Sequence, residues 1–409
     1  MVTSEIADDG VLRDPRIKDP WVDGVRRFTD EPVILTTSEL KGVARAAVEA
    51  CRAVDELVAA AANDAILLRA LGISPSLERL ARIDDPRWLA AARVDVFRTV
   101  EGAVACEVNS DTPTGFAETV AIGDRANRRG APGRDPSSLL EARWVAMMIE
   151  AAGCRPQDAV VGLIAPTEMT EDHNHLAWMQ ARLESVGFRV VRGSPFNLQA
   201  MSGHRVGLFD TPCDLVVRHY KTDWWAAREP VWIDEDPPSD AAPLERETAL
   251  IADACAHGTV NVVNPFGTAL SQNKRLVALA WEHPDRIGRE RSALVRAVFP
   301  ETRFLESMDL ARLRRERTSW VLKSDYGCEG EDVVVGTEVD DAVFAATLAA
   351  ARPGRWIAQR RFDPVRTSRG EQVNLGVWMM GSMPSGVYAR VSDGPTDGTA
   401  LGAPVRVIP

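Results

Sequence analysis

The segment RVDVFRTVEGAVACEVNSDTPT, residues 93–114, alternates polar and apolar side chains with the period of a β-strand on both sides of a turn-like Glu101–Gly102. The first half presents three side chains on one strand face: Arg93, Asp95 and Phe97. The second half presents three more on one face: Ala105, Glu107 and Asn109. A hairpin that pairs Asp95 with Glu107 also brings Arg93 opposite Asn109.

This hairpin would gather two carboxylates, an amide oxygen and a guanidinium on one patch. Hard oxygen ligands of this kind suit a divalent cation, and the guanidinium beside them suits an anion, which is the arrangement that magnesium–nucleotide chemistry needs. Asp and Asn are poor strand formers, which favours a functional reason for their presence. A hairpin whose polar face is simply solvated explains this segment equally well.

The length and charge of the chain limit the classes of function. A chain of 409 residues is too long for one small core, so two or three lobes are expected. The net charge is −11 and no dense basic run occurs, which argues against a nucleic-acid partner. The hydrophobic fraction of 45% and the charged fraction of 26% are those of an ordinary globular protein.

The N-terminal segment, the apolar stretches and the cysteines predict the cellular compartment of the protein. The N-terminal MVTSEIADDG lacks the apolar core of a signal peptide, and no apolar stretch approaches the roughly 20 residues that span a bilayer. The six cysteines are scattered, without a CxxC pair, as in a reducing interior. We therefore expect a cytoplasmic protein, monomeric or homodimeric, with no membrane partner.

Changes in pattern along the chain predict four regions. Residues 1–90 are mostly helical, with Thr36 and Glu39 in a capping box that opens a long Ala-rich helix. Residues 91–155 hold the hairpin and further helices. Residues 156–262 alternate strand and helix, beginning with the apolar run AVVGLIAP, and predict a small parallel α/β lobe. Residues 263–409 form the last lobe.

Lysines at two element ends are candidate phosphate ligands. Lys323 ends a predicted strand and precedes the Gly-bearing loop SDYGCEGED, where an ammonium and mobile backbone amides can hold phosphates. Lys274 opens a predicted helix. Neither lysine belongs to a Walker pattern, and solvated surface lysines are the alternative for both.

Four further polar residues each allow a ligand-binding interpretation and a purely structural one. Gln359, inside the strand WIAQRRF, could meet an adenine edge or be an ordinary strand residue, and Arg390 could stabilise phosphate charge or form a structural ion pair. Glu171 and Asp172 precede a helix of the small lobe, where loops after strands commonly form ligand sites. They could equally be acids favoured by the helix dipole.

Several of these motifs, in order, resemble one family. CEVNSDTPT, preceded by RVD, resembles the R-x-D and E-x-N-x-D metal core of the glutathionylspermidine synthase-like ATP-grasp ligases. The resemblance continues, over roughly residues 90–390, through TEDHNHLAWMQ, HYKTDWW, LSQNK, VLKSDYGCEG and QRRF. It implies an α/β fold with α+β lobes: a circularly permuted ATP-grasp fold with a small parallel pre-ATP-grasp-like lobe. The permuted order follows because the metal carboxylates precede the ATP lysines.

The resemblance assigns roles to the matching residues. The implied magnesium ligands, for two ions, are Asp95, Glu107 and Asn109. The implied phosphoryl-stabilising arginines are Arg93 and Arg390. The implied ATP-binding residues, with the segment from Gly327 to Gly330 as a lid over the phosphates, are Lys274, Lys323, Gly327, Gly330 and Gln359. The implied substrate-binding residues are Thr112, Thr114, Glu171 and Asp172.

The implied activity is ATP-dependent ligation of a small carboxylate (an amino acid or small peptide) to an amine, through an acyl phosphate. The chain departs from the family pattern at Cys328, where the loop usually carries an arginine, and it has no fused amidase domain. The first 90 or so residues carry no quotable family motif. Two alternatives therefore stay open: a catalytically degenerate nucleotide-binding protein and an ATP-grasp phosphotransferase.

Overall fold

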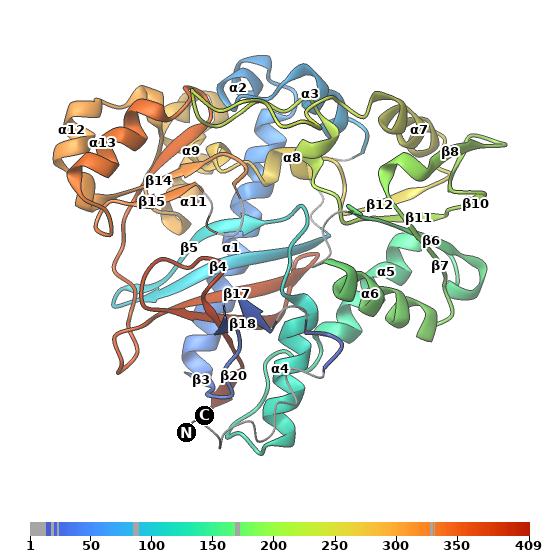
Figure 1. Cartoon of the computed structure of the whole chain (residues 1–409), viewed down its shortest axis with the longest axis horizontal. Helices are drawn as coiled ribbons and strands as arrows, with labels where there is room; N and C mark the ends of the chain where they lie inside the picture. The colour runs from blue at the N-terminus through green and yellow to red at the C-terminus, as the bar shows by residue number, and fades with distance from the viewer. Residues whose placement is uncertain are drawn as a thin grey trace.

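A five-stranded antiparallel sheet lies at the centre of the computed structural model, which describes residues 14–17, 20–22, 24–84, 90–167, 172–327, 330 and 332–409 (Figure 1). In spatial order its strands are β19 (Leu401–Ala403), β18 (Met383–Ser392), β17 (Gln372–Met380), β4 (Ala91–Thr99) and β5 (Gly102–Asn109). The hairpin β4–β5 thus shares a sheet with strands from near the C-terminus. This is the permuted connectivity that the resemblance implied.

The predicted pairing within the hairpin is confirmed. Asp95 lies opposite Glu107, and Arg93 lies opposite Asn109. Arg93 and Asp95 are both buried, although charged groups are seldom found inside a protein without partners. The polar alternation therefore does not face bulk solvent.

One predicted face is wrong, because a β-bulge interrupts the hairpin. The register shifts after Asp95, so that Val96 pairs with Ala105 and Cys106 is the extra residue. Ala105 consequently lies in the hydrophobic core on the other side of the sheet, fully buried. Cys106 takes its place on the face that carries Glu107.

Helix α1 (Thr37–Ala61) packs across the core face of this sheet. The predicted capping box is confirmed: Thr36 accepts from the amide of Glu39, and Glu39 accepts from the amide of Thr36. The apolar pattern of this helix predicts five buried positions, of which Val43, Val54, Leu57 and Val58 are buried and Leu40 is half-buried. Strand β3 (Val33–Thr36), just before α1, pairs in parallel with β20 (Val405–Ile408) and joins the two ends of the described chain.

A second antiparallel sheet forms the upper left of Figure 1, with strand order β13 (Thr302–Phe304), β16 (Trp356–Arg360), β14 (Trp320–Ser324) and β15 (Val333–Val335). The surrounding helices are α9 (Arg275–Glu282), α11 (Arg289–Val298), α12 (Leu310–Arg315) and α13 (Asp341–Ala350). The sequence pattern of residues 305–315 predicts one helix, and that prediction is wrong. Asp309 accepts from the amides of Ala311 and Arg312, so it caps a new helix there, after a short 3-10 turn at Leu305–Ser307.

The small lobe contains a parallel sheet, as predicted, in the order β12 (Asn261–Val263), β11 (Leu215–Arg218), β6 (Val160–Ile164) and β7 (Arg189–Gly193). Helices α5 (Leu140–Ala152) and α6 (His173–Ser185) lie beside it (Figure 1). The apolar residues at 206–210 predict a further strand of the small lobe, but that strand is not part of this parallel sheet. It is β9 (Arg205–Leu208), which pairs antiparallel with β8 (Leu198–Met201) and β10 (Thr211–Pro212), because these short connections cannot make a parallel crossover.

The remaining elements complete the layers: α2 (Ala65–Ala70), α3 (Pro75–Ala81), α4 (Phe116–Arg128), α7 (Glu245–Ala256), α8 (Thr268–Ser271), α10 (Pro284–Ile287), β1 (Trp21–Val22) and β2 (Val25–Arg26). The sequence also predicts a short helix near Pro86, a segment that lies outside the described residues. Among the helices of the described ranges, none combines the length and the apolar character needed to cross a bilayer. The five described cysteines are free thiols.

Candidate active site

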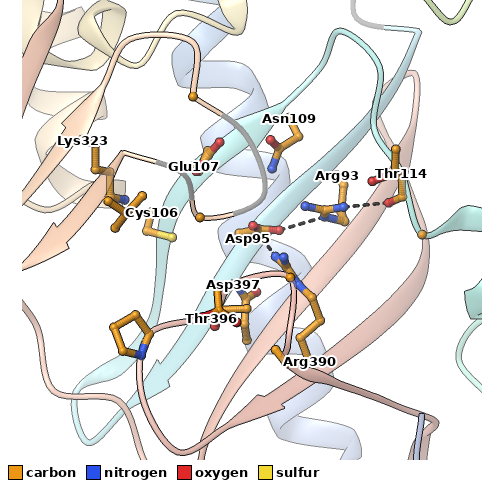
Figure 2. A pocket seen from close by; sticks show the side chains of 18 of the residues that line it. Arg93, Asp95, Cys106, Glu107, Asn109, Thr114, Lys323, Arg390, Thr396 and Asp397 are labelled. Atoms are coloured by element: carbon orange, nitrogen blue, oxygen red, sulfur yellow. Dashed lines mark hydrogen bonds and ion pairs between the residues drawn. The ribbon is translucent and has the colours of Figure 1, made fainter. Parts of the chain in front are cut away.

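A cavity of about 870 Å³ is lined by residues from the central five-stranded sheet, from the second, four-stranded antiparallel sheet and from loops of the small lobe. The hairpin β4–β5 and Lys323 face each other across it (Figure 2). Every described residue that the sequence singled out lines this one cavity: Arg93, Asp95, Glu107, Asn109, Thr112, Thr114, Asp172, Lys274, Lys323, Gly327, Gly330, Gln359 and Arg390. Glu171 and Cys328 lie outside the described residues. A cavity of this size can hold a nucleotide-sized ligand.

Asp95 lies between two guanidinium groups at the centre of the cavity. Arg93 Nε donates to Asp95 Oδ1 at 3.0 Å, and Arg390 Nη2 donates to Asp95 Oδ2 at 2.6 Å. Burial alone would raise the pKa of Asp95, but the positive charges of Arg390 and Arg93, with their hydrogen bonds, outweigh it and lower that pKa well below its usual range. Asp95 therefore stays ionised and holds both arginines in place.

The lowered pKa of Asp95 predicts how stability depends on pH. The unfolded pKa of an aspartate is about 3.9, so the Asp95 contribution is fully present above about pH 5 and is lost as pH falls toward the lower folded value. We expect the difference in unfolding free energy between wild type and Asp95→Asn to be constant from about pH 7 to about pH 5 and to shrink below about pH 4. Urea unfolding of both proteins at these pH values measures it, and a difference that widens with acid would contradict the assignment.

Arg93 is held at both ends of its side chain. Its Nη1 donates to the carbonyl of Thr114 at 2.7 Å, which ties the strand β4 to the loop that follows β5. Its aliphatic part lies over Gly376 of β17, the residue paired with Asp95. A Cβ at Gly376 would lie 2.7 Å from Arg93 Cδ, so this position requires glycine. This need for glycine could not be predicted from the sequence, because Gly376 lies in an apolar strand far along the chain from the hairpin.

Glu107 and Lys274 form an ion pair across the cavity floor. Lys274 Nζ lies 3.2 Å from Glu107 Oε1 and donates to the carbonyl of Gly327 at 2.6 Å. The Lys274 side chain is only 7% exposed, and that of Glu107 19%. A half-buried carboxylate beside a buried ammonium, at the mouth of a loop that carries backbone amides, suits a polyanion with its counterions.

Lys323 and Gln359 are partners on neighbouring strands. Lys323 Nζ donates to Gln359 Oε1 at 2.9 Å, and Gln359 Nε2 donates to Thr302 Oγ1 at 3.1 Å. Both Lys323 and Gln359 are buried at the cavity wall. In this structure Gln359 therefore orients the Lys323 ammonium, in addition to lining the space beside it.

Two amide side chains at the cavity have polar atoms without a partner. Asn109 Nδ2 and Asn374 Oδ1 are buried and make no hydrogen bond within the described part of the chain. Gln272, in the LSQNK motif, lies near Asn109 Oδ1 at 3.5 Å and accepts from the amides of Ser110 and Asp111. Because buried polar groups are nearly always satisfied, these orphaned atoms point to a ligand that enters the cavity.

Asp111 is a structural residue that the sequence reasoning missed. Its carboxylate accepts from Arg218 Nη2 at 2.7 Å, from the amide of Thr222 at 2.6 Å and from Thr268 Oγ1 at 2.8 Å. It thereby fastens the loop of Thr112 and Thr114 to the small lobe. The E-x-N-x-D pattern contained this signal, since its last acid is Asp111, but the partners are distant in sequence.

The loop after β14 meets the loop before β19 at the cavity rim. Gly330 has φ +83°, and a Cβ there would lie 2.9 Å from the Asp397 Cβ. Thr396 and Asp397 line the same cavity and lie beside Arg390 in Figure 2. Gly330 therefore permits the close approach of two loops over the site.

Comparison with known proteins gives a family match over most of the chain. A family model described as glutathionylspermidine synthase preATP-grasp matches residues 20–401. The match begins well before residue 90, so a resemblance limited to residues 90–390 was too narrow, and the N-terminal helical region is included. No curated protein sequence matches the chain.

Solved structures share the fold at low sequence identity. A glutathione synthetase-like effector from Globodera pallida, in its apo form, has a TM-score of 0.62 at 14% identity, covering 97% of this chain and 94% of that one. A protein from Methylobacillus flagellatus, provisionally described as a gamma-glutamylcysteine synthetase, has a TM-score of 0.45 at 14% identity, with 82% and 83% coverage. The first likeness and the family match together confirm the predicted α/β fold of the ATP-grasp type.

Proposed function

Since the chain belongs to the glutathionylspermidine synthase preATP-grasp family, we propose that it is an ATP-dependent ligase that joins a small carboxylate to an amine as an amide. The observation that supports this most is the collection of charges on one cavity. Carboxylates from the hairpin face two buried lysines, Lys274 at the start of α9 and Lys323 in β14, and two arginines flank them.

The residues present fit magnesium and ATP. The oxygen donors on the hairpin are those that magnesium prefers: Asp95, Glu107 and Asn109. Lys274 and Lys323 would hold phosphates, each already oriented by a partner at 2.6–2.9 Å. The unsatisfied atoms of Asn109 and Asn374 support a polar ligand in the same space. The magnesium ions, when bound, supply positive charge to the phosphate oxygens.

In the proposed reaction a carboxylate oxygen bonds to the γ-phosphorus of ATP and ADP leaves, then the amine nitrogen bonds to the acyl carbon and phosphate leaves with loss of the amine proton. Arg93 and Arg390 offset the charge that develops on the transferred group. Asp95 fixes both guanidiniums beforehand, so the arginines need little reorganisation at the moment of transfer.

The loops at the rim would keep water from the activated acid. Gly330 lies against Asp397, and Lys274 holds the carbonyl of Gly327, so the loop of the second sheet is fastened at both described glycines. Exclusion of water protects an intermediate that hydrolysis would otherwise destroy.

A coupled screen tests the proposal. The purified chain is incubated with ATP, magnesium, and pairs drawn from amino acids, short peptides and polyamines, with ADP, phosphate and products measured. We expect ADP and phosphate only when an acid and an amine are both present, together with an amide. A phosphorylated product would instead indicate a phosphotransferase. Nucleotide binding by calorimetry with no product from any pair would indicate a degenerate binding protein.

Lys323→Gln is expected to raise the KM for ATP about tenfold or more, because it removes a charge-assisted contact of roughly 1.5–3 kcal/mol. Initial rates at varied ATP measure this effect. Lys41→Gln, an exposed lysine on α1, is the matched control and should leave KM unchanged. An unchanged KM in Lys323→Gln would remove Lys323 from the phosphate site.

A further inference from the structure

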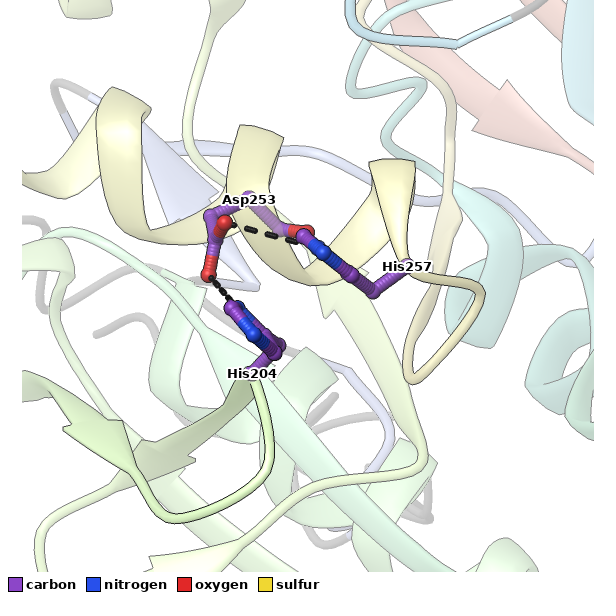
Figure 3. Close-up of side chains that lie close together, drawn as sticks. All are labelled: His204, Asp253 and His257. Carbon is purple, nitrogen blue, oxygen red and sulfur yellow. Dashed lines mark hydrogen bonds and ion pairs between the residues drawn. The ribbon is translucent and has the colours of Figure 1, made fainter.

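Two histidines and an aspartate form a cluster on the small lobe (Figure 3), and none of the three lines the cavity described above. His204 lies between β8 and β9, and Asp253 and His257 lie one helical turn apart at the C-terminal end of α7. One ligand atom of each residue lies within 4.8 Å of the other two. Within the described ranges this is the one group of three or more His, Cys, Asp or Glu side chains that meets this condition.

The two imidazole rings are stacked face to face with the carboxylate at their edge. Their centroids are 3.7 Å apart and their planes differ by 10°. His204 Nδ1 lies 3.1 Å from Asp253 Oδ2, and His257 Nδ1 lies 2.9 Å from the carbonyl oxygen of Asp253. The carboxylate therefore contacts both rings, through Oδ2 to His204 and through Oδ1, which lies 3.4 Å from Nδ1, to His257.

The spacing of the ligand atoms is close to that of a metal site, although the exposed, stacked rings must turn apart before both aim a nitrogen at one ion. Bonds of 2.0–2.1 Å to a tetrahedral ion separate neighbouring ligand atoms by about 3.3 Å, near the 3.1 Å between His204 and Asp253. The carbonyl contact of His257 orients its ring and leaves Nε2 for a ligand, as outer-shell hydrogen bonds do for metal-bound histidines.

The backbone of His204 has an unusual conformation, fixed by a hydrogen bond to the segment after α7. His204 has φ +57°, which few residues other than glycine adopt, and its carbonyl accepts from Thr259 Oγ1 at 2.7 Å. Thr259 follows α7, so this hydrogen bond keeps the turn of the β8–β9 hairpin beside the helix end that carries Asp253 and His257. The His204 ring is thereby presented to the other two side chains.

We propose that His204, Asp253 and His257 bind one divalent transition-metal ion of the zinc type, at a site separate from the ATP cavity. Imidazole nitrogens favour such ions over magnesium, whose preferred ligands are oxygens. The side chains are about half exposed (57%, 53% and 47%), so an ion reaches them from solvent and keeps water in its remaining position. The bound ion links the β8–β9 hairpin to the C-terminal end of α7.

Calorimetric titration of the full chain with zinc chloride tests the site, after removal of any polyhistidine tag and treatment with a chelator. We expect one zinc ion per chain. His204→Ala and His257→Ala should each lower the affinity by more than the roughly 10–100-fold that loss of an outer-shell partner costs. Zinc should also raise the Tm of the wild type and leave that of His204→Ala unchanged, because binding stabilises only the folded chain that presents all three ligands.

Two control variants locate the ion. His173→Ala removes an exposed histidine on α6, and Glu107→Gln removes a carboxylate of the ATP cavity; zinc affinity should stay unchanged in both. The proposal is overturned if zinc does not bind saturably, if both cluster variants bind as the wild type does, or if Glu107→Gln abolishes binding. Since the readout is zinc binding, these outcomes do not depend on the ligase activity.

Discussion

Replacement of Glu107 by glutamine is expected to lower kcat of the proposed ATP-dependent amide formation by about 10³-fold, the scale on which loss of one electrostatic group in an active site lowers the rate. Glutamine keeps the size and one oxygen but removes the charge that faces Lys274 at 3.2 Å. With that charge gone, the hairpin offers one carboxylate for metal, Asp95, which two arginines already neutralise. Initial rates of ADP and amide release measure the effect.

Glu101→Gln is the matched control for this variant. Glu101 lies at the exposed turn of the same hairpin, so the same chemical change there should leave kcat within about twofold, as surface substitutions usually do. Thermal melting of both variants checks that the hairpin still folds. Full activity in Glu107→Gln would show that the metal ligands have been assigned wrongly.

Replacement of Asp111 by alanine is expected to destabilise the protein by about 3–5 kcal/mol, the cost of breaking a buried ion pair from one side. The Arg218 side chain is fully buried, so its charge would lose its carboxylate partner at 2.7 Å with no access to solvent. The Thr222 amide and two threonine hydroxyls would lose an acceptor as well. The shift of the urea unfolding midpoint measures this loss.

An exposed ion pair provides the comparison for Asp111. Asp158 pairs with Arg155 at 2.7 Å, with side chains 50% and 75% exposed, so Asp158→Ala should cost less than about 1 kcal/mol. Asp111→Asn, which retains an acceptor oxygen, should lie between the two. Equal midpoints for Asp111→Ala and Asp158→Ala would contradict a role for Asp111 in fastening the loop.

The hairpin shows how far local pattern reaches. Its strands, its turn and the pairing of Asp95 with Glu107 follow from a period of two and a short loop, and the structure confirms them. The structure places Cys106 on the cavity face where the pattern predicts Ala105. This could not be predicted, because a bulge in β5 depends on how the whole sheet packs, including the pairing of β4 with β17 on its other side. The prediction for strand β9 is wrong for the same reason: its apolar residues fit the parallel sheet of the small lobe as well as the antiparallel sheet with β8 and β10.

The candidate site divides in the same way. Residue types and the order of motifs indicated which side chains to examine, and all of those that the structure describes line one cavity. The contacts that hold them were not predictable: Arg390 with Asp95, Lys274 with Glu107, and Arg218 with Asp111 each join residues far apart in the chain.

By itself, then, the sequence determined the strands and turn of the hairpin, the pairing of Asp95 with Glu107, the capped helix and the permuted order, because these depend on neighbours within a few residues and on motif order. The tertiary structure alone decided which charges are neutralised, which amide atoms lack a partner and where two loops touch. Those properties arise from burial and from pairs brought together only when the sheets pack, and no local pattern carries that information.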